Sequence, residues 1–196
     1  MQGMLTTIET EKLLKACKKG SYKARSKVYK IYAPMLLGIC LRYTKNKSEA
    51  EDVLHEGFIK IYTKIDQAGR GSFEGWMKKI IMNEALQFLR NRNISFKRHE
   101  KYELDYISDL ASTDDVSFEG ISTKTILDFI QKLPEGYRLI FNLYVFEEYS
   151  HKQIAELLNI SEGTSKSQYS RAKSKLKKSI NDYKDNKLKE NKYEGI

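Results

Sequence analysis

Apolar residues recur at helical spacing along most of this chain, and the pattern predicts a succession of amphipathic helices. The apolar stretch at 33–43 is too short to span a membrane and predicts a buried core helix. Only two prolines and little valine also favour an all-α fold over a sheet. The amphipathic helices are expected at about 9–18, 21–31, 49–65, 73–92, 123–133 and 134–148.

Several helix ends carry local signals. Ser48 and Glu51 fit a capping box at the start of the 49–65 helix. Leu133, which precedes a proline, is expected to end one helix, and Pro134 suits the first turn of the next. Beyond Tyr183 the chain is polar, and we expect a frayed tail.

Residues 149–179 predict two short helices joined by a tight turn. Ser150 and Gln153 have the spacing of a capping box for the first helix. Asn159 suits the left-handed residue that ends it, and Ser161 suits the cap of the second helix. This layout is typical of a helix-turn-helix, whose second helix enters the major groove of DNA.

The second helix of this unit combines a polar side with a packing side. Tyr169, Ala172 and Leu176 mark the packing side. Polar and cationic side chains suit base edges and phosphates, although a basic helix can also be an ordinary solvated surface. The candidate residues for DNA contact are Lys166, Ser167, Gln168, Ser170, Arg171 and Lys173.

Charge divides the chain into three parts. The net charge is +9 and the pI about 9.3, which fits a polyanionic partner but does not choose between DNA, RNA and a membrane. The positive charge lies in 1–93 and after 122, whereas 94–122 is acidic and loses helical periodicity. We therefore predict two small helical domains, 1–93 and 123–183, a flexible acidic linker at 94–122, and a polar tail at 184–196.

The sequence contains no recognisable motif for catalysis or metal binding. Cys17 and Cys40 are too few and too isolated for a disulfide framework or a zinc site, so a reduced, cytoplasmic protein is expected. His55, His99 and His151 lie in separate segments without metal-ligand spacing. Nucleophile elbows and phosphate loops are missing, so we expect no catalytic residue, no metal and no cofactor.

Two blocks of the chain resemble a known family. SEAEDVLHEGFIKIYTKI (48–65) followed by SFEGWMKKIIMNEALQFLRNRN (72–93) is similar to the second conserved region of bacterial extracytoplasmic-function (group IV) sigma factors, of the sigma-70 family. The stretch 133–176 is similar to their fourth region. The resemblance covers about 20–180, and the order and spacing of both blocks are specific.

The resemblance implies a promoter-specific initiation factor that binds core RNA polymerase. The helix beginning AEDVLHE implies polymerase-binding residues Asp52, Glu56, Phe58 and Lys60. The loop at 66–72 and the next helix imply capture of the −10 element as single strand, for which a polar, cationic pocket is suited. Trp76 could stack on a base there, but its place on the apolar stripe favours core packing. The implied −10 residues are Arg70, Lys78, Lys79, Asn83, Arg90 and Arg92.

The residues already selected on the second helix of the helix-turn-helix correspond to the family's −35 reader. Many relatives have Arg at the positions of Lys166 and Gln168, and Lys cannot make the planar two-pronged contact of Arg. The family's loop commonly carries Phe-Arg-Gly before an acidic residue. The loop at 66–72 has Arg70 but no such acid after it, so base preferences cannot be transferred. The acidic linker suits a segment that threads the RNA channel of the polymerase.

The resemblance further implies control by an anti-sigma protein, often membrane-bound, while the chain itself inserts in no membrane. A second interpretation is a stand-alone helix-turn-helix regulator with an N-terminal sensing or dimerisation domain. Such a regulator binds DNA tightly without polymerase, usually at a symmetric operator. The basic N-terminal half, with its Gly-bearing loop and cationic helix, favours the sigma factor.

Overall fold

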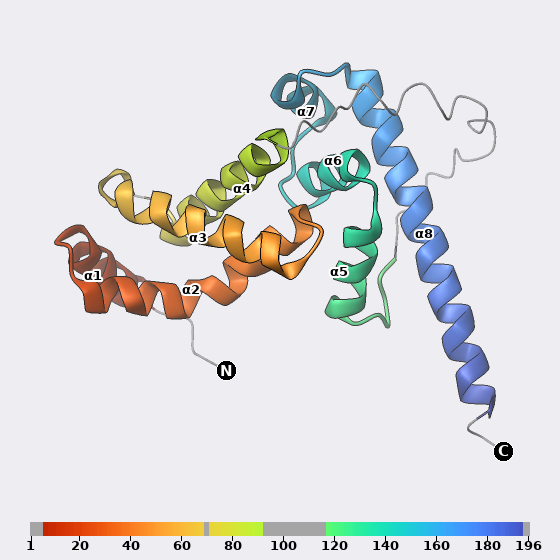
Figure 1. Cartoon of the computed structure of the whole chain (residues 1–196), viewed down its shortest axis with the longest axis horizontal. Coiled ribbons are helices and arrows are strands. Elements are labelled where there is room, and N and C mark those ends of the chain that lie inside the picture. The colour runs from red at the N-terminus through yellow and green to blue at the C-terminus, as the bar shows by residue number, and fades with distance from the viewer. Residues whose placement is uncertain (1–5, 69–70, 92–116, 194–196) are drawn as a thin grey trace. The chain divides into compact units, whose positions relative to one another are not determined.

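The computed structural model describes residues 6–68, 71–91 and 117–193, with side chains up to 187 (Figure 1). Its regular elements within these ranges are all helices, which confirms the predicted all-α fold. The chain forms two compact units, 1–92 and 93–196. They are called here the N-terminal and the C-terminal unit.

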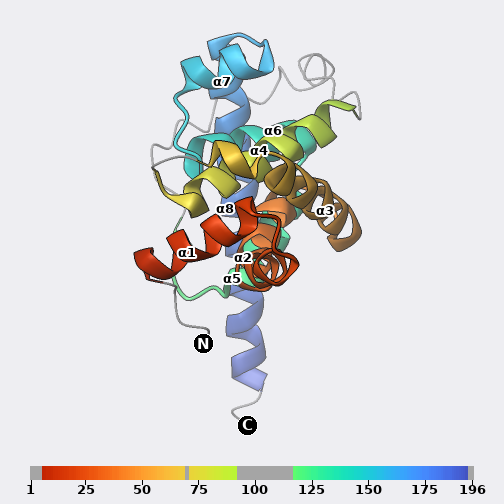
Figure 2. The same cartoon turned by 90° about the vertical axis from the view of Figure 1, so that its left-hand side faces the viewer.

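The N-terminal unit packs three long helices against one another, with a shorter helix against the first of them (Figure 2). Leu36, Ile61, Met77 and Ile81 are fully buried where the long helices meet. The elements are α1 (Thr7–Lys18), α2 (Tyr22–Tyr43), α3 (Lys47–Thr63), the 3-10 turn η1 (Ile65–Gln67) and α4 (Phe73–Asn91).

Helix α2 differs from the prediction of separate segments at 21–31 and 33–43. It runs without interruption through Pro34, although a proline inside a helix costs about 3 kcal/mol. Its second half buries Leu36, Ile39 and Tyr43, as expected of a core helix. This packing favours one continuous helix over the break that the local sequence indicates, because tertiary contacts override propensity.

Helix α3 begins two residues earlier than predicted. Its cap is Asn46, whose Oδ1 accepts a hydrogen bond from the N–H of Glu49 at 2.9 Å. The Glu49 carboxylate accepts one from the N–H of Lys45 at 3.0 Å. The predicted capping box of Ser48 and Glu51 is therefore wrong: both residues lie inside the helix, and Asn46 provides the acceptor instead.

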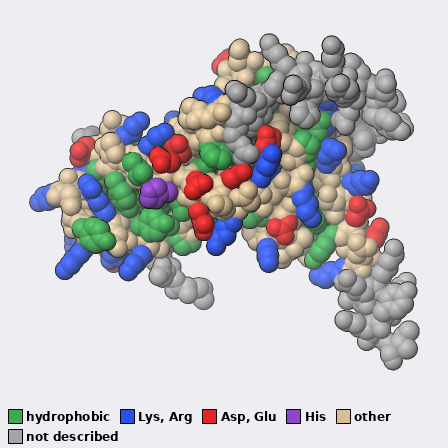
Figure 3. Space-filling view, in the orientation of Figure 1, with side chains coloured by type: hydrophobic (Ala, Val, Ile, Leu, Met, Phe, Trp, Pro, Cys, Tyr) green, Lys and Arg blue, Asp and Glu red, His purple; other side chains and the backbone are tan. Residues whose placement is uncertain are grey.

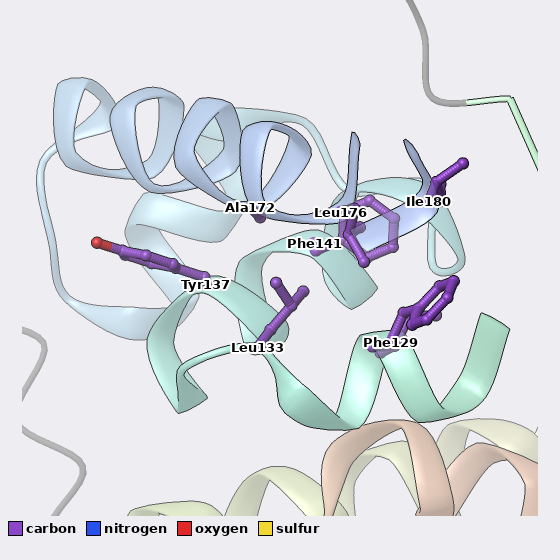
Figure 4. Close-up of a cluster of buried hydrophobic side chains, with 8 residues drawn as sticks. Phe129, Leu133, Tyr137, Phe141, Ala172, Leu176 and Ile180 are labelled. Carbon is purple, nitrogen blue, oxygen red and sulfur yellow. The ribbon is translucent and has the colours of Figure 1, made fainter. Parts of the chain in front are cut away.

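The described part of the C-terminal unit contains four helices, of which the first, second and fourth surround one apolar cluster (Figure 4). Pro134 is the N-cap of the second helix, one residue before its predicted place. The helices are α5 (Thr123–Lys132), α6 (Glu135–Val145), α7 (His151–Leu158) and α8 (Glu162–Tyr193). The buried cluster comprises Phe129, Ile130, Leu133, Tyr137, Phe141, Ala172, Leu176 and Ile180.

Two segments of the C-terminal unit, at 117–122 and after Tyr183, are more ordered than the sequence suggested. Phe118 and Ile121, assigned to the flexible linker, are partly buried against the apolar cluster. The remainder of that linker up to residue 116 lies outside the described residues. Helix α8 does not fray after Tyr183 but continues to Tyr193, and the Tyr183 ring contacts Phe129 with centroids 5.9 Å apart.

Two glycines inside helices should respond oppositely to alanine. A Cβ at Gly57 of α3 meets the Cδ1 of Ile81 in α4, whereas one at Gly38 of α2 meets nothing within 4 Å. We expect Gly38→Ala to stabilise the N-terminal unit by about 0.5–1 kcal/mol through helix propensity. Gly57→Ala should cost about 1–3 kcal/mol through overpacking. Urea unfolding of both variants checks this, and equal shifts would contradict the close α3–α4 contact.

Candidate nucleic-acid interface

The helix-turn-helix predicted at 149–179 is formed by α7 and the first half of α8. The Ser150 hydroxyl accepts from the N–H of Gln153 at 3.3 Å, and the Gln153 side chain accepts from the N–H of Ser150 at 2.8 Å. Asn159 ends α7 at φ 53°, in the left-handed region. Ser161 accepts from the N–H of Thr164 at 2.9 Å at the start of α8. The predicted capping box, left-handed residue and second cap are all confirmed.

Aromatic side chains fix the angle between these helices. Tyr144, at the end of α6, has its ring centroid 4.5 Å from His151 and 4.5 Å from Tyr169. His151 Nδ1 is also hydrogen-bonded to the fully buried hydroxyl of Ser165 at 2.9 Å. One histidine at the start of α7 thus joins α6 and α8. Burial lowers the pKa of His151 below its ordinary value, and nearby Lys166 lowers it further.

The C-terminal unit should lose stability as the pH falls from 7.5 to 5.5. Because the pKa of His151 is lower in the folded state, the unfolded chain takes up the proton first. The stabilisation is present above the unfolded pKa of about 6.5 and declines as the pH falls towards the folded pKa. Thermal unfolding of the full chain should show this decline, and His151→Gln should flatten it. An unchanged slope in His151→Gln would contradict the assignment.

The start of α8 presents a polar surface beside this aromatic cluster. Lys166, Ser167 and Ser170 are exposed, and Lys166 forms an ion pair with Glu162 at 2.6 Å. Arg171 and Lys173 are half-buried at its edge. Five of the six predicted −35 residues are therefore at least partly accessible. We call Lys166, Ser167, Ser170, Arg171 and Lys173 the α8 face.

Gln168 does not belong to the α8 face. It is only 3% exposed, so the structure contradicts its selection as a DNA contact. The reason is helical periodicity, since Ala172 and Leu176 follow it at four and eight residues and are fully buried. That spacing was visible in the sequence, and it outweighs the polarity of the side chain.

A second polar stripe lies along α4. Lys79, Asn83 and Arg90, all predicted, are exposed. Gln87 was not predicted, although it follows Asn83 by four residues, and it donates to Asn91 Oδ1 at 2.9 Å. We call Lys79, Asn83, Gln87 and Arg90 the α4 stripe.

The other predicted −10 residues do not belong to the α4 stripe. Lys78 is half-buried and forms an ion pair with Glu74 at 2.6 Å. Trp76 is half-buried and stacks on Phe73 with centroids 5.9 Å apart, so it packs along the helix surface. Arg70 and Arg92 lie outside the described residues.

Helix α3 carries the predicted polymerase-binding residues. Asp52 and Glu56 are exposed, and Figure 3 shows Asp and Glu side chains gathered over α3 with hydrophobic side chains beside them. Lys60 is half-buried and forms an ion pair with Glu84 of α4. Ile59, which was not predicted, is 47% exposed on the same helix.

Phe58 is a correction to this set. It is 3% exposed, and its ring lies 4.6 Å from Tyr29 and 5.7 Å from Tyr62 between centroids. It therefore belongs to the core between α2 and α3 and is not available to a partner. Its place on the stripe of Leu54 and Ile61 already indicated burial.

The described residues contain no group of His, Cys, Asp or Glu that could hold a metal ion. No helix in the described ranges is long and apolar enough to cross a membrane.

Comparison with known proteins assigns both units. Residues 28–94 match the family description "Sigma-70 region 2", and residues 123–176 match "Sigma-70, region 4". The chain is 30% identical to the extracytoplasmic-function (ECF) RNA polymerase sigma factor SigW of Bacillus subtilis, over 88% of this chain and 97% of SigW. The chain is an ECF sigma factor of the sigma-70 family. This confirms the resemblance seen in the sequence.

A second curated relative agrees with this membership. The sigma factor is 27% identical to RNA polymerase sigma-H factor of Pseudomonas aeruginosa, over 90% of this chain and 96% of that protein. A solved structure of the sigma factor RpoE in complex with the anti-sigma factor NepR, from Bartonella quintana, matches with 20% identity and a TM-score of 0.47. It covers 80% of this chain and 96% of that chain.

Proposed function

We propose that this sigma factor binds core RNA polymerase and directs it to promoters, with the N-terminal unit reading the −10 element and the C-terminal unit the −35 element. The observation that carries the proposal is the presence of both matched regions in one chain, each with an exposed polar surface. A stand-alone regulator is not favoured, because it has no use for region 2. The chain acts through the polymerase and performs no chemistry itself.

The α8 face is proposed to read duplex DNA at the −35 element. It lies in the first turns of the second helix of a helix-turn-helix, the part that enters the major groove. Ser167 and Ser170 can hydrogen-bond base edges there, and the start of the helix favours phosphate. Arg171 and Lys173, at the edge, are placed to contact the DNA backbone.

The α4 stripe is proposed to follow the unpaired strand of the −10 element. Its members recur at about four residues, so they form a continuous polar line along one side of the helix. Lys79 and Arg90 supply positive charge for phosphates, and Asn83 and Gln87 supply amides for base edges. The loop at 66–72 immediately precedes α4 and is proposed to capture a base.

The exposed side of α3 is proposed to bind the polymerase through Asp52, Glu56 and Ile59. Acidic groups around an exposed apolar side chain fit a partner surface that is basic and partly apolar. Glu56→Lys should weaken binding to core polymerase by about tenfold. Glu11→Lys, an equal charge change at an exposed position of α1, is the matched control and should bind as the wild type.

Titration of fluorescently labelled protein with core polymerase measures both affinities. Equal affinities for Glu56→Lys and the wild type would refute the α3 surface as the binding site. Failure of the wild-type chain to bind would refute the function itself.

We also propose control by an anti-sigma protein that covers the DNA-reading surfaces until a signal releases them. This proposal rests on membership of the ECF group. An initiation factor works where polymerase and chromosome meet, so we propose that the chain acts in the cytoplasm.

A further inference from the structure

Helix α1 contacts the first residues of the 66–72 loop through the ammonium group of Lys18. Lys18 Nζ donates hydrogen bonds to the carbonyl of Asp66 at 3.2 Å and to that of Ala68 at 3.1 Å. Asp66 lies in the 3-10 turn η1, and Ala68 is its C-cap. A single cation therefore joins two backbone positions at the base of the loop, with charge-assisted hydrogen bonds that are stronger than neutral ones.

The same segment is fixed independently by the core. Ile65 is 3% and Ala68 4% exposed. The N–H groups of Gln67 and Ala68 donate to the carbonyls of Lys64 and Ile65 at 2.9 and 3.1 Å. The buried side chains of Ile65 and Ala68 thus hold the segment 65–68 in the core of the N-terminal unit. Lys18 in turn orients the carbonyl groups of Asp66 and Ala68.

Backbone hydrogen bonds fix the end of α1 that carries Lys18. The N–H of Gly20 donates to the carbonyl of Cys17 at 3.0 Å, and that of Ser21 donates to the carbonyl of Ala16 at 3.1 Å. Gly20 has φ 81°, so these bonds form the Schellman motif that ends many helices. Cys17 is fully buried. Lys18 therefore extends from a fixed helix end, where a cation is also favoured by the helix dipole.

We propose that Lys18 is a positioning residue for −10 recognition, because it fixes the backbone at Asp66 and Ala68, where the 66–72 loop begins. The inference rests on the proposed function. Helix α1 precedes residue 28, where the match to region 2 begins, so the N-terminal helix of this chain adds a support that the matched region does not contain. Backbone at Asp66 and Ala68 that is already fixed loses less entropy when the strand arrives, so both affinity and discrimination should rise.

The test compares holoenzymes reconstituted from core polymerase and the full chain. The measurement is the ratio of affinities for two single-stranded oligonucleotides, one with the non-template −10 sequence of the chain's own promoter and one with that sequence scrambled. Lys18→Met should lower this ratio about three- to tenfold. Core binding, the melting temperature of the N-terminal unit and binding of duplex −35 DNA should not change.

Two further variants separate positioning from charge. Lys15→Met removes an equal charge from an exposed position of the same helix and should keep the wild-type ratio. Lys18→Arg retains a cationic donor and should restore most of the discrimination. The inference is overturned if Lys18→Met keeps the wild-type ratio, if Lys15→Met loses as much, or if Lys18→Met loses core binding in parallel. A wild-type holoenzyme with no preference for the −10 strand would refute the proposed function, and the inference with it.

Discussion

Two carboxylates on the α8 face should abolish −35-dependent transcription. In the variant Ser167→Glu with Ser170→Glu, both new charges replace exposed hydroxyls of the proposed DNA-reading surface, where phosphates would repel them. We expect about 100-fold fewer transcripts from a −35-dependent promoter, which corresponds to about 2.7 kcal/mol. Glu is a good helix former, so α8 should remain folded and core binding should remain normal. Run-off transcription and polymerase titration measure the two effects.

The matched control places the same two charges further along α8. Asn181→Glu with Asn186→Glu changes two exposed positions. Asn181 follows Ser167 by fourteen residues, about 21 Å along the helix, well beyond the Debye length of about 8 Å. This variant should transcribe within about twofold of the wild type. Equal loss in both variants, or normal transcription by the first, would show that the α8 face is wrongly assigned.

Leu176→Ala should unfold the C-terminal unit at a much lower temperature. Leu176 is fully buried in the apolar cluster between α5, α6 and α8. Truncating such a side chain costs about 2–5 kcal/mol through lost transfer energy and the cavity left behind. For a unit of this size the melting temperature should fall by about 10–30 °C. Calorimetry of the full chain measures it.

The N-terminal unit provides an internal reference for that experiment, because the chain forms two compact units. Its transition should not move in Leu176→Ala. Lys175→Ala, at an exposed neighbouring position, should leave both transitions within about 0.5 kcal/mol of the wild type. A small shift in Leu176→Ala, or an equal shift of both transitions, would contradict the separate apolar cluster.

Local signals made the helix-turn-helix predictable from residue types and their spacing. Its three end signals, at Ser150, Asn159 and Ser161, act within a few residues of each other. Because such caps depend only on neighbouring residues, they can be recognised in the sequence. The two matched regions were likewise recognisable from residue order and spacing.

The errors arose where distant contacts or competing caps decide the outcome. The break expected near Pro34 is absent because the buried side of α2 favours one continuous helix. Asn46, and not Ser48, is the N-cap of α3, although either side chain can accept a hydrogen bond from the free N–H groups at a helix start. Helix α8 continues to Tyr193, and in this part of the helix Tyr183 contacts Phe129, a residue more than fifty positions away in the sequence.

The sequence analysis placed two buried residues among the candidate site residues. Gln168 and Phe58 were chosen for their chemistry, but helical periodicity places both of them inside. The same periodicity could have added Gln87 to the α4 stripe. The contact of Lys18 could not be predicted, because it joins a side chain to carbonyls 48 and 50 residues later and leaves no pattern in the sequence.

The most direct measurement is transcription in vitro by core polymerase on the DNA upstream of this chain's own gene, with and without the protein. We predict a new start site that requires the full chain, is preceded by −10 and −35 elements, and is lost in Ser167→Glu with Ser170→Glu. Absence of any new start, together with tight binding of the chain alone to a symmetric DNA site, would contradict the proposed function and identify a stand-alone regulator.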